Sequence, residues 1–297
     1  MTAEQRPSAR GGHPAGVQQP RTVRTADGES VAYATYGDPE GTPVVVLHGT
    51  PGSRRLGALF DRAARTHGVR VLAPDRPGYG RSSPWPGRSV ADAAAFVTPV
   101  LDDADVDAAR LAGFSGGGPY ALSTAATRPD RVDGVDVIAG ATPPTVGGDA
   151  PAVQRLIATL ATRAPRVLGG LLRGQAWCAE RLDPSFVVGQ YTASNATDPV
   201  PDRVAETVRA DFLEAFAHGR SGAVTEFRTT STDWGVDIAA IETDVDLWYG
   251  TADTNVPFDH ARGLERAIPT AELHALDGAD HLRTLVRSVP EVLTAGR

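Results

Sequence analysis

The sequence predicts an α/β fold in which a doubly wound, mostly parallel sheet carries an inserted block of helices. Short apolar runs rich in β-branched residues alternate with segments of helical periodicity over most of the chain. The alternation stops over residues 143–235, where helical periodicity continues alone, and resumes from residue 236. Glycine, serine, aspartate and histidine follow several of the apolar runs, at the strand ends where open parallel sheets place functional residues.

Length and composition exclude several classes of protein. The 297 residues are enough for one large α/β domain. Cys178 is the only cysteine, which excludes an internal disulfide and a cysteine-based metal cluster. The net charge is −7 and the basic residues form no stripe, so we expect no nucleic-acid partner. No apolar run approaches the roughly 18 residues of a membrane-spanning helix, so we expect no membrane partner.

The amino-terminal residues 1–20 are rich in glycine, proline, glutamine and arginine and lack the apolar segment of a secretion signal. We therefore expect a disordered tail there and a cytoplasmic protein. All 29 basic residues are arginine, and alanine, glycine and proline are abundant. This bias indicates a GC-rich bacterial genome and carries no functional signal.

The first half of the chain predicts strands and helices in alternation. Two short strands are expected at residues 22–25 and 31–36, around an Ala-Asp-Gly turn. The run Pro-Val-Val-Val-Leu at residues 43–47 is typical of a strand buried on both faces of a parallel sheet. The elements expected next are a helix over 53–66, a strand over 69–73, a helix over 90–104, a strand over 109–114, a helix after residue 115 and a strand over 135–139.

The second half predicts a helical block and then a return to the sheet. Apolar residues recur at helical spacing near residues 153–160, 167–172 and 204–216. We interpret residues 143–235 as a helical cap inserted into one domain, so that residues 21–142 and 236–297 together form its core. The elements expected after the cap are strands over 245–249 and 271–276, and helices over 259–267 and from residue 282.

A Gly-x-Ser-x-Gly motif places Ser115 between the strand over 109–114 and a helix. A sharp strand-to-helix turn exposes the serine, and Gly113 and Gly117 avoid clashes between strand and helix. The N–H of Gly116 would then lie at a helix N-terminus, where an oxyanion is stabilised. Pro119 suits the first turn of that helix. A plain glycine-rich turn is the alternative, so the assignment depends on the rest of the site.

A second turn, His-Gly-Thr-Pro-Gly at residues 48–52, directly follows the buried strand over 43–47. Its glycines permit a tight turn, in which the Thr50 N–H points at the oxyanion that Gly116 would bind. We expect His48 to make a structural hydrogen bond there.

An acid and a base are expected at the ends of the last two strands. Asp253 follows the strand over 245–249, and its carboxylate would orient a histidine through Nδ1–H. His281 lies on the loop after the last strand, whereas His260 falls on a helix and His274 within a strand. Asp280 is the rival to Asp253, but neighbouring side chains on a loop usually diverge.

The order oxyanion turn, Ser115, Asp253, His281 is the chain order of the α/β-hydrolase triad. From about residue 21 onward the sequence resembles an α/β-hydrolase of the lid-bearing esterase, epoxide-hydrolase and proline-iminopeptidase group. The resemblance rests on residues 48–52 and on Asp-Arg-Pro-Gly-Tyr-Gly-Arg-Ser at residues 75–82, together with the triad motifs. It implies that the helical block covers the site.

Two departures narrow what the resemblance implies. Dehalogenases and epoxide hydrolases of this group carry aspartate as nucleophile, so Ser115 argues against both chemistries. Aminopeptidase relatives usually have a second glycine where Thr50 stands, and their caps bind the substrate amino group with acids. We expect the candidate acids here, Glu206, Asp211 and Glu214, to form a solvated helix face.

The residues predict a cofactor-independent, metal-free serine hydrolase that cleaves carboxylic esters through an acyl-enzyme on Ser115. The substrate is expected to be a small ester with an apolar part, contacted by Trp177, Phe212 and Phe216 unless these side chains only pack the cap on the core. The alternatives are an aminopeptidase or amidase, a C–C hydrolase, a cofactor-free perhydrolase, and a ligand-binding receptor with slow turnover. The sequence predicts no oligomeric state.

Overall fold

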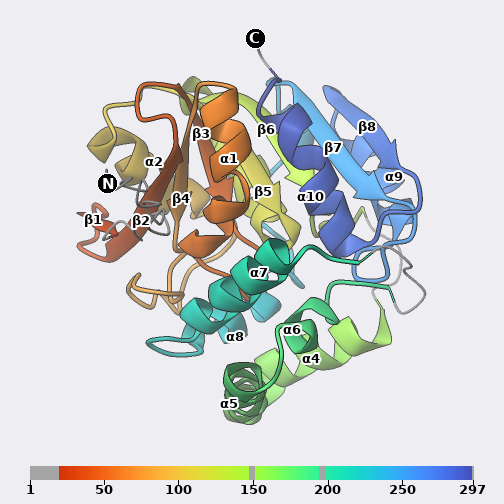
Figure 1. The fold of residues 1–297 in the computed structure, drawn as a ribbon. Helices are drawn as coiled ribbons and strands as arrows, with labels where there is room; N and C mark the ends of the chain where they lie inside the picture. Colours follow the sequence, from red (N-terminus) through yellow and green to blue (C-terminus); the bar gives the residue numbers. More distant parts are fainter. Residues whose placement is uncertain (1–19, 147–150, 194–198, 296–297) are drawn as a thin grey trace, which may run out of the picture.

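The computed structural model describes residues 20–146, 151–193 and 199–295. The tail expected over residues 1–20 therefore lies, except for Pro20, outside the described residues. One eight-stranded sheet with the order β1-β2-β4-β3-β5-β6-β7-β8 runs through the molecule, and helices cover both of its faces (Figure 1). β2 is antiparallel to β1 and to β4, and the remaining neighbours are parallel. The fold class expected from the sequence is thus confirmed.

All eight strands expected from the sequence are present, with ends shifted by a few residues at most. The strands are β1 Arg21–Arg24, β2 Ser30–Gly37, β3 Thr42–Leu47, β4 Val69–Pro74, β5 Ala109–Phe114, β6 Val132–Ile138, β7 Val245–Gly250 and β8 Ala271–Leu276. The inner parallel strands are buried on both faces because helices cover each side, which explains their continuous apolar runs.

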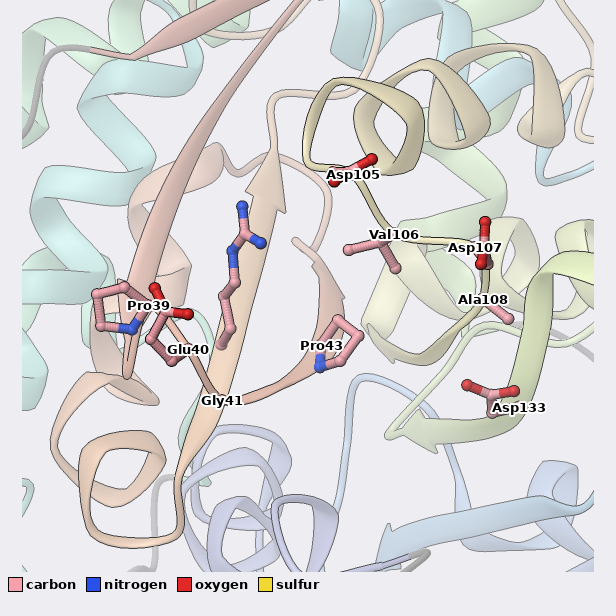
Figure 2. Close-up of a pocket in the computed structure, with 10 residues that line it drawn as sticks. Pro39, Glu40, Gly41, Pro43, Asp105, Val106, Asp107, Ala108 and Asp133 are labelled. Carbon is pink, nitrogen blue, oxygen red and sulfur yellow. The ribbon is translucent and has the colours of Figure 1, made fainter.

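The amino and carboxyl ends of the parallel strands are lined by different kinds of residue. At the amino ends of β3 to β6, ten residues line a hollow of about 450 Å³, drawn in Figure 2. Glu40, Asp105, Asp107 and Asp133 face this hollow together with Arg70. The turns that carry the candidate catalytic residues lie at the opposite, carboxyl ends of β3, β5, β7 and β8. The hollow is therefore separate from the candidate active site.

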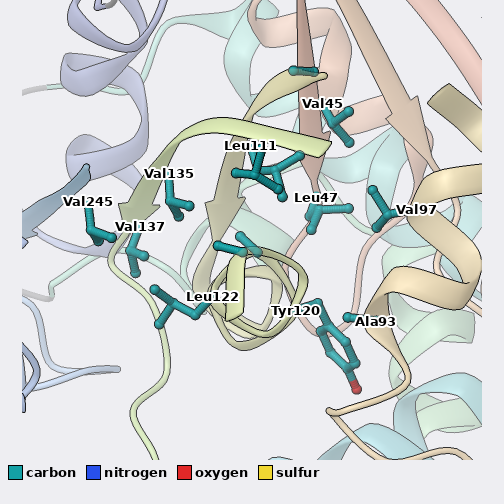
Figure 3. Close-up of a cluster of buried hydrophobic side chains, with 14 of the residues drawn as sticks. Val45, Leu47, Ala93, Val97, Leu111, Tyr120, Leu122, Val135, Val137 and Val245 are labelled. Atoms are coloured by element: carbon teal, nitrogen blue, oxygen red, sulfur yellow. The ribbon is translucent and has the colours of Figure 1, made fainter. Parts of the chain in front are cut away.

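Two apolar clusters form the core, one on each face of the sheet. Val45 and Leu47 of β3 point to one cluster, whereas Val44 and Val46 point to the other, as the alternation along a strand requires. Figure 3 shows part of the first cluster, in which side chains of β3, β5 and β6 gather with Tyr120 and Leu122.

The helices of the core follow the division between the two clusters. α2 (Ala93–Asp103), α3 (Gly118–Thr127) and α9 (Phe258–Ala267) cover the first face, and α1 (Asp61–Thr66) and α10 (His281–Val292) cover the second. Figure 1 shows α1 and α10 together on one side of the sheet.

Within the described residues, five α-helices lie between β6 and β7, and we call the segment that carries them, residues 143–235, the insertion. They are α4 Ala152–Arg163, α5 Pro165–Arg181, α6 Ser185–Val188, α7 Asp202–Ala215 and α8 Ser221–Thr229. Figure 1 shows them gathered at one end of the sheet. Within the described ranges, none of the helices is both long enough and apolar enough to cross a membrane.

One expected helix is replaced by two shorter elements. Residues 53–66 form a 3-10 helix, Arg54–Leu59, followed by α1. The N–H groups of Ser53 and Leu56 donate to Asp211 of the insertion, and the N–H of Arg54 donates to Asp75. Carboxylates from remote parts of the chain therefore satisfy the backbone of this segment, which sequence periodicity does not reveal.

Two other boundaries differ from expectation. The helix expected from residue 90 begins only at Ala93, because Asp92 accepts hydrogen bonds from the N–H and hydroxyl of Ser89 and holds the preceding residues in a turn. Three residues of 3-10 helix, Pro129–Arg131, lead from α3 into β6, and Ile238–Ala240 forms another short 3-10 segment before β7.

Candidate active site

Ser115 lies at the tip of a sharp turn between β5 and α3. Its φ angle is +52°, a left-handed conformation that is rare and strained for a residue with a Cβ. A short 3-10 turn, Ser115–Gly117, then leads into α3. The turn leaves Ser115 partly exposed although the residues on both sides of it are buried.

Neighbouring glycines make this turn possible. A Cβ at Gly113 would lie 2.7 Å from the carbonyl oxygen of Gly117, and a Cβ at Gly117 would lie 2.3 Å from that of Leu47. Both contacts are far closer than a real Cβ tolerates, so a side chain at either position would force the strand and helix apart.

Asp253 and His281 meet at the ends of β7 and β8. Oδ2 of Asp253 lies 2.7 Å from Nδ1 of His281, and both side chains are buried. The other carboxylate oxygen of Asp253 accepts hydrogen bonds from the N–H groups of Asn255 (2.8 Å) and Val256 (3.0 Å). Because an ionised carboxylate only accepts hydrogen bonds, Nδ1 carries the imidazole proton and Nε2 is left as the basic nitrogen.

Asp280 does not contact the ring of its neighbour His281. It is the N-cap of α10 and accepts a hydrogen bond from the N–H of Arg283 (2.9 Å) and another from the N–H of Ala193 (3.1 Å). The cap places His281 at the first position of α10, with its ring directed at Asp253. The side chains of Asp280 and its neighbour His281 thus diverge, as expected.

Phe114, beside Ser115 in the chain, packs against the imidazole of His281. The ring of Phe114, which immediately precedes Ser115, lies 4.9 Å from the His281 ring, centroid to centroid. Among the described residues the Ser115 hydroxyl has no hydrogen-bond partner, so the structure contains no Ser115–His281 hydrogen bond. Such bonds are often long in an enzyme without substrate and shorten in the reacting complex.

Thr50 and Gly116 adjoin each other. A Cβ at Gly116 would lie 2.0 Å from Thr50 Oγ1 and 3.4 Å from the Thr50 nitrogen, so only glycine fits beside the threonine. No described residue accepts a hydrogen bond from the Thr50 N–H. An unpaired backbone donor next to a strained serine is the arrangement expected of an oxyanion site.

His48 makes structural hydrogen bonds, as expected. Its Nδ1–H donates to the Gly49 carbonyl (2.8 Å), and its Nε2 accepts from the N–H of Arg76 (3.0 Å). Complete burial, and then the charge of the adjacent Arg76, hold the pKa of this imidazole well below its ordinary value. His48 is therefore neutral and fixes the turn without titrating near pH 7.

Tyr191 of the insertion is a neighbour of the site that sequence reasoning missed. Its ring stacks on His281, with centroids 6.1 Å apart and planes 10° from parallel. Its carbonyl accepts a hydrogen bond from the N–H of Leu282 (2.9 Å), and the carbonyl of Gln190 accepts one from Asn255 (3.0 Å). No local motif marks Tyr191, because its position depends on how the insertion folds back on the loops after β7 and β8.

The expectation of a solvated acidic face on α7 is wrong for two of its three residues. Asp211 is buried and accepts hydrogen bonds from the N–H and hydroxyl of Ser53. Glu214 forms ion pairs with Arg54 (2.7 Å) and Arg55 (3.2 Å). Both carboxylates pack on the segment that follows the 48–52 turn. Only Glu206 is exposed as expected.

The aromatic residues expected near the substrate differ in their burial. Phe212 and Phe216 are buried and pack edge to face, with ring centroids 5.2 Å apart, so they join insertion to core. Trp177 is 56% exposed on α5, so it does not pack the insertion on the core. Its contact with substrate stays a prediction, because helical spacing alone does not show which face of α5 meets a ligand.

One group of side chains within the described ranges has the types and spacing of metal ligands: Asp246, Glu272 and His274 on β7 and β8. Asp246 is already paired with Arg110 and accepts a hydrogen bond from His274 (2.8 Å). These contacts account for the cluster as part of an ion-pair network on one face of the sheet.

Comparison with known proteins shows the family of the chain. Residues 42–286 match the model of the alpha/beta hydrolase fold family. The chain is 28% identical over 274 residues to a 2-hydroxy-6-oxononadienedioate/2-hydroxy-6-oxononatrienedioate hydrolase from Cupriavidus pinatubonensis, covering 90% of each chain. It is 27% identical to a non-heme chloroperoxidase from Streptomyces lividans, covering 92% of this chain and 96% of the relative.

Solved structures show the same fold at lower sequence identity. A bromoperoxidase from Bacillus anthracis superposes with a TM-score of 0.71 at 22% identity, over 93% of this chain and 98% of its own. A thermophilic esterase from Thermogutta terrifontis superposes with a TM-score of 0.69 at 21% identity, over 93% and 96%. The sheet order, the strained serine after β5 and the family match together identify the chain as a member of the alpha/beta hydrolase fold family.

Proposed function

We propose that this protein is a serine hydrolase that cleaves carboxylic esters through an acyl-enzyme on Ser115. The observation that carries the proposal is the 2.7 Å contact between buried Asp253 and His281, beside the strained turn that presents Ser115. A strained non-glycine residue and a buried His–Asp pair each cost stability, and their meeting at one end of the sheet is explained by catalysis.

The geometry suggests a role for each residue. Nε2 of His281 takes the hydroxyl proton of Ser115 as the serine oxygen attacks the acyl carbon. Asp253 holds the imidazole in the reactive tautomer and stabilises its positive charge. The N–H groups of Thr50 and Gly116 bind the oxyanion of the tetrahedral intermediate. His281 then returns the proton to the leaving alcohol and activates the water that releases the acid.

The insertion acts in this proposal as the cap of a lid-bearing esterase. Tyr191 and the adjacent backbone of the insertion contact His281 and the Asp253 loop, so the substrate enters between insertion and core. Residues 143–235 would then select the substrate, while residues 21–142 and 236–297 supply the chemistry.

Charges near the turn favour a neutral ester over an amine or a dianion. An aminopeptidase needs unpaired carboxylates for the substrate amino group, whereas Asp211 and Glu214 are both engaged with the segment after the turn. The dienedioate named for the Cupriavidus relative carries two carboxylates. The buried arginines beside the turn, Arg54 and Arg76, already pair with protein carboxylates.

Labelling with a fluorophosphonate probe tests the nucleophile. We expect one covalent adduct, mapped by mass spectrometry to Ser115, and none in Ser115→Ala. The matched control is Ser123→Ala, since Ser123 is a buried serine of α3 whose hydroxyl has no hydrogen-bond partner in the described structure. Its labelling should equal that of the wild type. Labelling at another residue, or none, would contradict the proposal.

A substrate panel tests the bond that is cleaved. It contains p-nitrophenyl esters of increasing acyl length, amino-acid amides, a substrate of C–C hydrolases, and peroxide together with a halide as a test of perhydrolysis. We expect ester turnover to exceed the others and to depend on Ser115. Faster C–C cleavage or perhydrolysis than ester hydrolysis would keep the nucleophile but replace the substrate class.

A further inference from the structure

We propose that Glu226 is a positioning residue that holds the oxyanion donors in place from the insertion, through Thr50 and Arg76. The inference rests on the proposed function, because it concerns the same N–H groups. Glu226 lies on α8 and its side chain is completely buried. Its Oε2 accepts hydrogen bonds from Thr50 Oγ1 (2.7 Å), Arg76 (2.8 Å) and the Tyr79 hydroxyl (2.6 Å).

Arg76 fixes the direction of the Thr50 N–H. Its Nη2 donates to the carbonyl of Gly49 at 2.9 Å, and Nδ1–H of His48 donates to the same oxygen at 2.8 Å. That carbonyl and the Thr50 N–H belong to one planar trans peptide, so they point in opposite directions. Holding the carbonyl on one side therefore aims the N–H to the other.

The same guanidinium also reaches the second oxyanion segment. Nη1 of Arg76 donates to the carbonyl of Gly116, so one buried cation contacts both backbone segments that carry the proposed donors. Glu226 in turn binds Arg76 and the side chain of Thr50. Removing the carboxylate charge would weaken the hydrogen bond from Thr50 Oγ1 and leave the guanidinium without its buried counter-charge.

α8 approaches the loop over residues 75–82 closely enough for this contact because two glycines face each other. The N–H of Gly222 donates to the carbonyl of Gly78 at 3.3 Å. A Cβ at Gly222 would lie 2.6 Å from that carbonyl oxygen, and a Cβ at Gly78 would lie 2.7 Å from the Gly222 backbone. The loop that presents Arg76 and Tyr79 is thus packed directly on the helix that presents Glu226.

The net charge of Arg76, Arg88 and Glu226 allows a positioning role to be distinguished from a direct electrostatic effect on the oxyanion. Arg76, Arg88 and Glu226 are all fully buried, and Arg88 binds the other oxygen of Glu226 at 3.1 Å, so the three carry one net positive charge. Burial holds the pKa of Tyr79 well above its ordinary value, so the phenol stays protonated and donates. Replacing Glu226 by glutamine makes the cluster more positive, which alone would favour an oxyanion.

The test is the affinity of Glu226→Gln for an aryl trifluoromethyl ketone, whose serine hemiketal carries the same oxyanion as the tetrahedral intermediate. We expect about 10- to 100-fold weaker ketone binding and a matching fall in kcat, because misplaced donors lose most of their transition-state stabilisation. KM for a p-nitrophenyl ester should change little. In a folded variant, ketone binding that is unchanged or tighter would overturn the positioning role.

Two controls separate positioning from general loss of an ion pair. Glu214→Gln removes another carboxylate of the insertion, one that pairs with Arg54 and Arg55 and contacts neither Thr50 nor Arg76, and its ketone affinity should match the wild type. Thr50→Val removes the hydroxyl that binds Glu226 but keeps the N–H, whereas Thr50→Ser keeps both. We expect weaker ketone binding in the valine variant and recovery in the serine variant.

The threonine pair also decides the matter if Glu226→Gln does not fold. Equal ketone affinity in Thr50→Val and Thr50→Ser would then overturn the inference. Absence of a ketone adduct on wild-type Ser115 contradicts the proposed function itself, whereas an adduct whose affinity is independent of Glu226 contradicts only the positioning role.

Discussion

The two sides of the candidate site are built differently. On the sheet side, Ser115 directly follows β5, Asp253 and His281 lie on the short segments after β7 and β8, and short motifs mark each of them. On the insertion side, Glu226 and Asp211 reach the turn over residues 48–52 and the segment after it from helices more than 150 residues away in the chain. The sheet side supplies the reacting groups, and the insertion side fixes the backbone around them.

This difference has an energetic basis. A strand end is fixed by the hydrogen-bonded sheet, so a residue a few positions beyond it needs little further support. The turn over residues 48–52 leaves the sheet and has no regular hydrogen bonds of its own. Arg76 and His48 donate to the Gly49 carbonyl of the turn instead. Glu226 of the insertion binds Thr50 Oγ1 and Arg76, and the ion pairs around it are retained although burying charge is costly.

Asp253→Asn should have the largest effect on the sheet side. An amide in place of the carboxylate no longer enforces the Nδ1–H tautomer of His281, so kcat for ester hydrolysis should fall about 10³- to 10⁴-fold. Asp280→Asn is the control, since asparagine also caps helices, and it should lower kcat far less. Steady-state rates decide between them, and an equal loss in both variants would contradict the assignment of Asp253.

Asp211→Asn tests the insertion side through pH. Burial raises the pKa of Asp211 to about 7, so the folded protein binds this proton more tightly than the unfolded chain does. The stabilisation from that proton is complete at pH below about 4 and is lost as pH rises towards 7. Wild type should therefore lose about 2 kcal/mol of unfolding free energy relative to Asp211→Asn between pH 5 and pH 7.

Urea unfolding of both proteins at the two pH values measures this difference. Glu206→Gln, an exposed change on the same helix, should follow the wild-type pH dependence. If Asp211→Asn also follows it, Asp211 is ionised throughout and burial does not govern its titration.

Gly222→Ala tests whether the close approach of α8 to the loop over residues 75–82 is needed for stability and activity. The new Cβ would meet the backbone of Gly78, so the helix must shift, and overpacking of this kind costs about 1–3 kcal/mol of unfolding free energy. Because Glu226 moves with the helix, kcat should fall roughly tenfold. Gly174→Ala in α5 meets open space and should stabilise the protein by about 0.5–1 kcal/mol without changing kcat. An unchanged kcat in Gly222→Ala would show that the position of α8 does not affect the turn over residues 48–52.

Trp177→Ala should have the smallest effect. The side chain is mostly exposed and contacts Arg181, whose guanidinium lies 4.4 Å from the ring centroid. Loss of an exposed contact of this kind costs about 0.5–1 kcal/mol at most, and kcat/KM for every ester in the panel should be unchanged. A changed acyl-length preference would show that α5 turns this face towards substrate.

The same contrast explains how much the sequence could predict. Short apolar runs between segments of helical periodicity locate the eight described strands, and Gly-x-Ser-x-Gly, Asp253 and His281 follow strands that those runs identify. Asp211 lies three residues after Val208 and next to Phe212, so helical spacing places it on the buried side of α7, away from the exposed Glu206; the charge of its side chain is what led to the expectation of a solvated face. Glu226, Tyr191 and the outward face of Trp177 depend on how the insertion folds against the core, which periodicity does not encode.

The acyl-enzyme itself offers the most direct test of the proposed mechanism. During turnover of a p-nitrophenyl ester, wild-type enzyme is quenched in acid and analysed by intact mass and peptide mapping. We expect one acyl group per chain, on Ser115, which is absent from Ser115→Ala and retained in Ser123→Ala. Steady ester hydrolysis by the wild type with no acyl group on Ser115, or with the group on another residue, would contradict this mechanism.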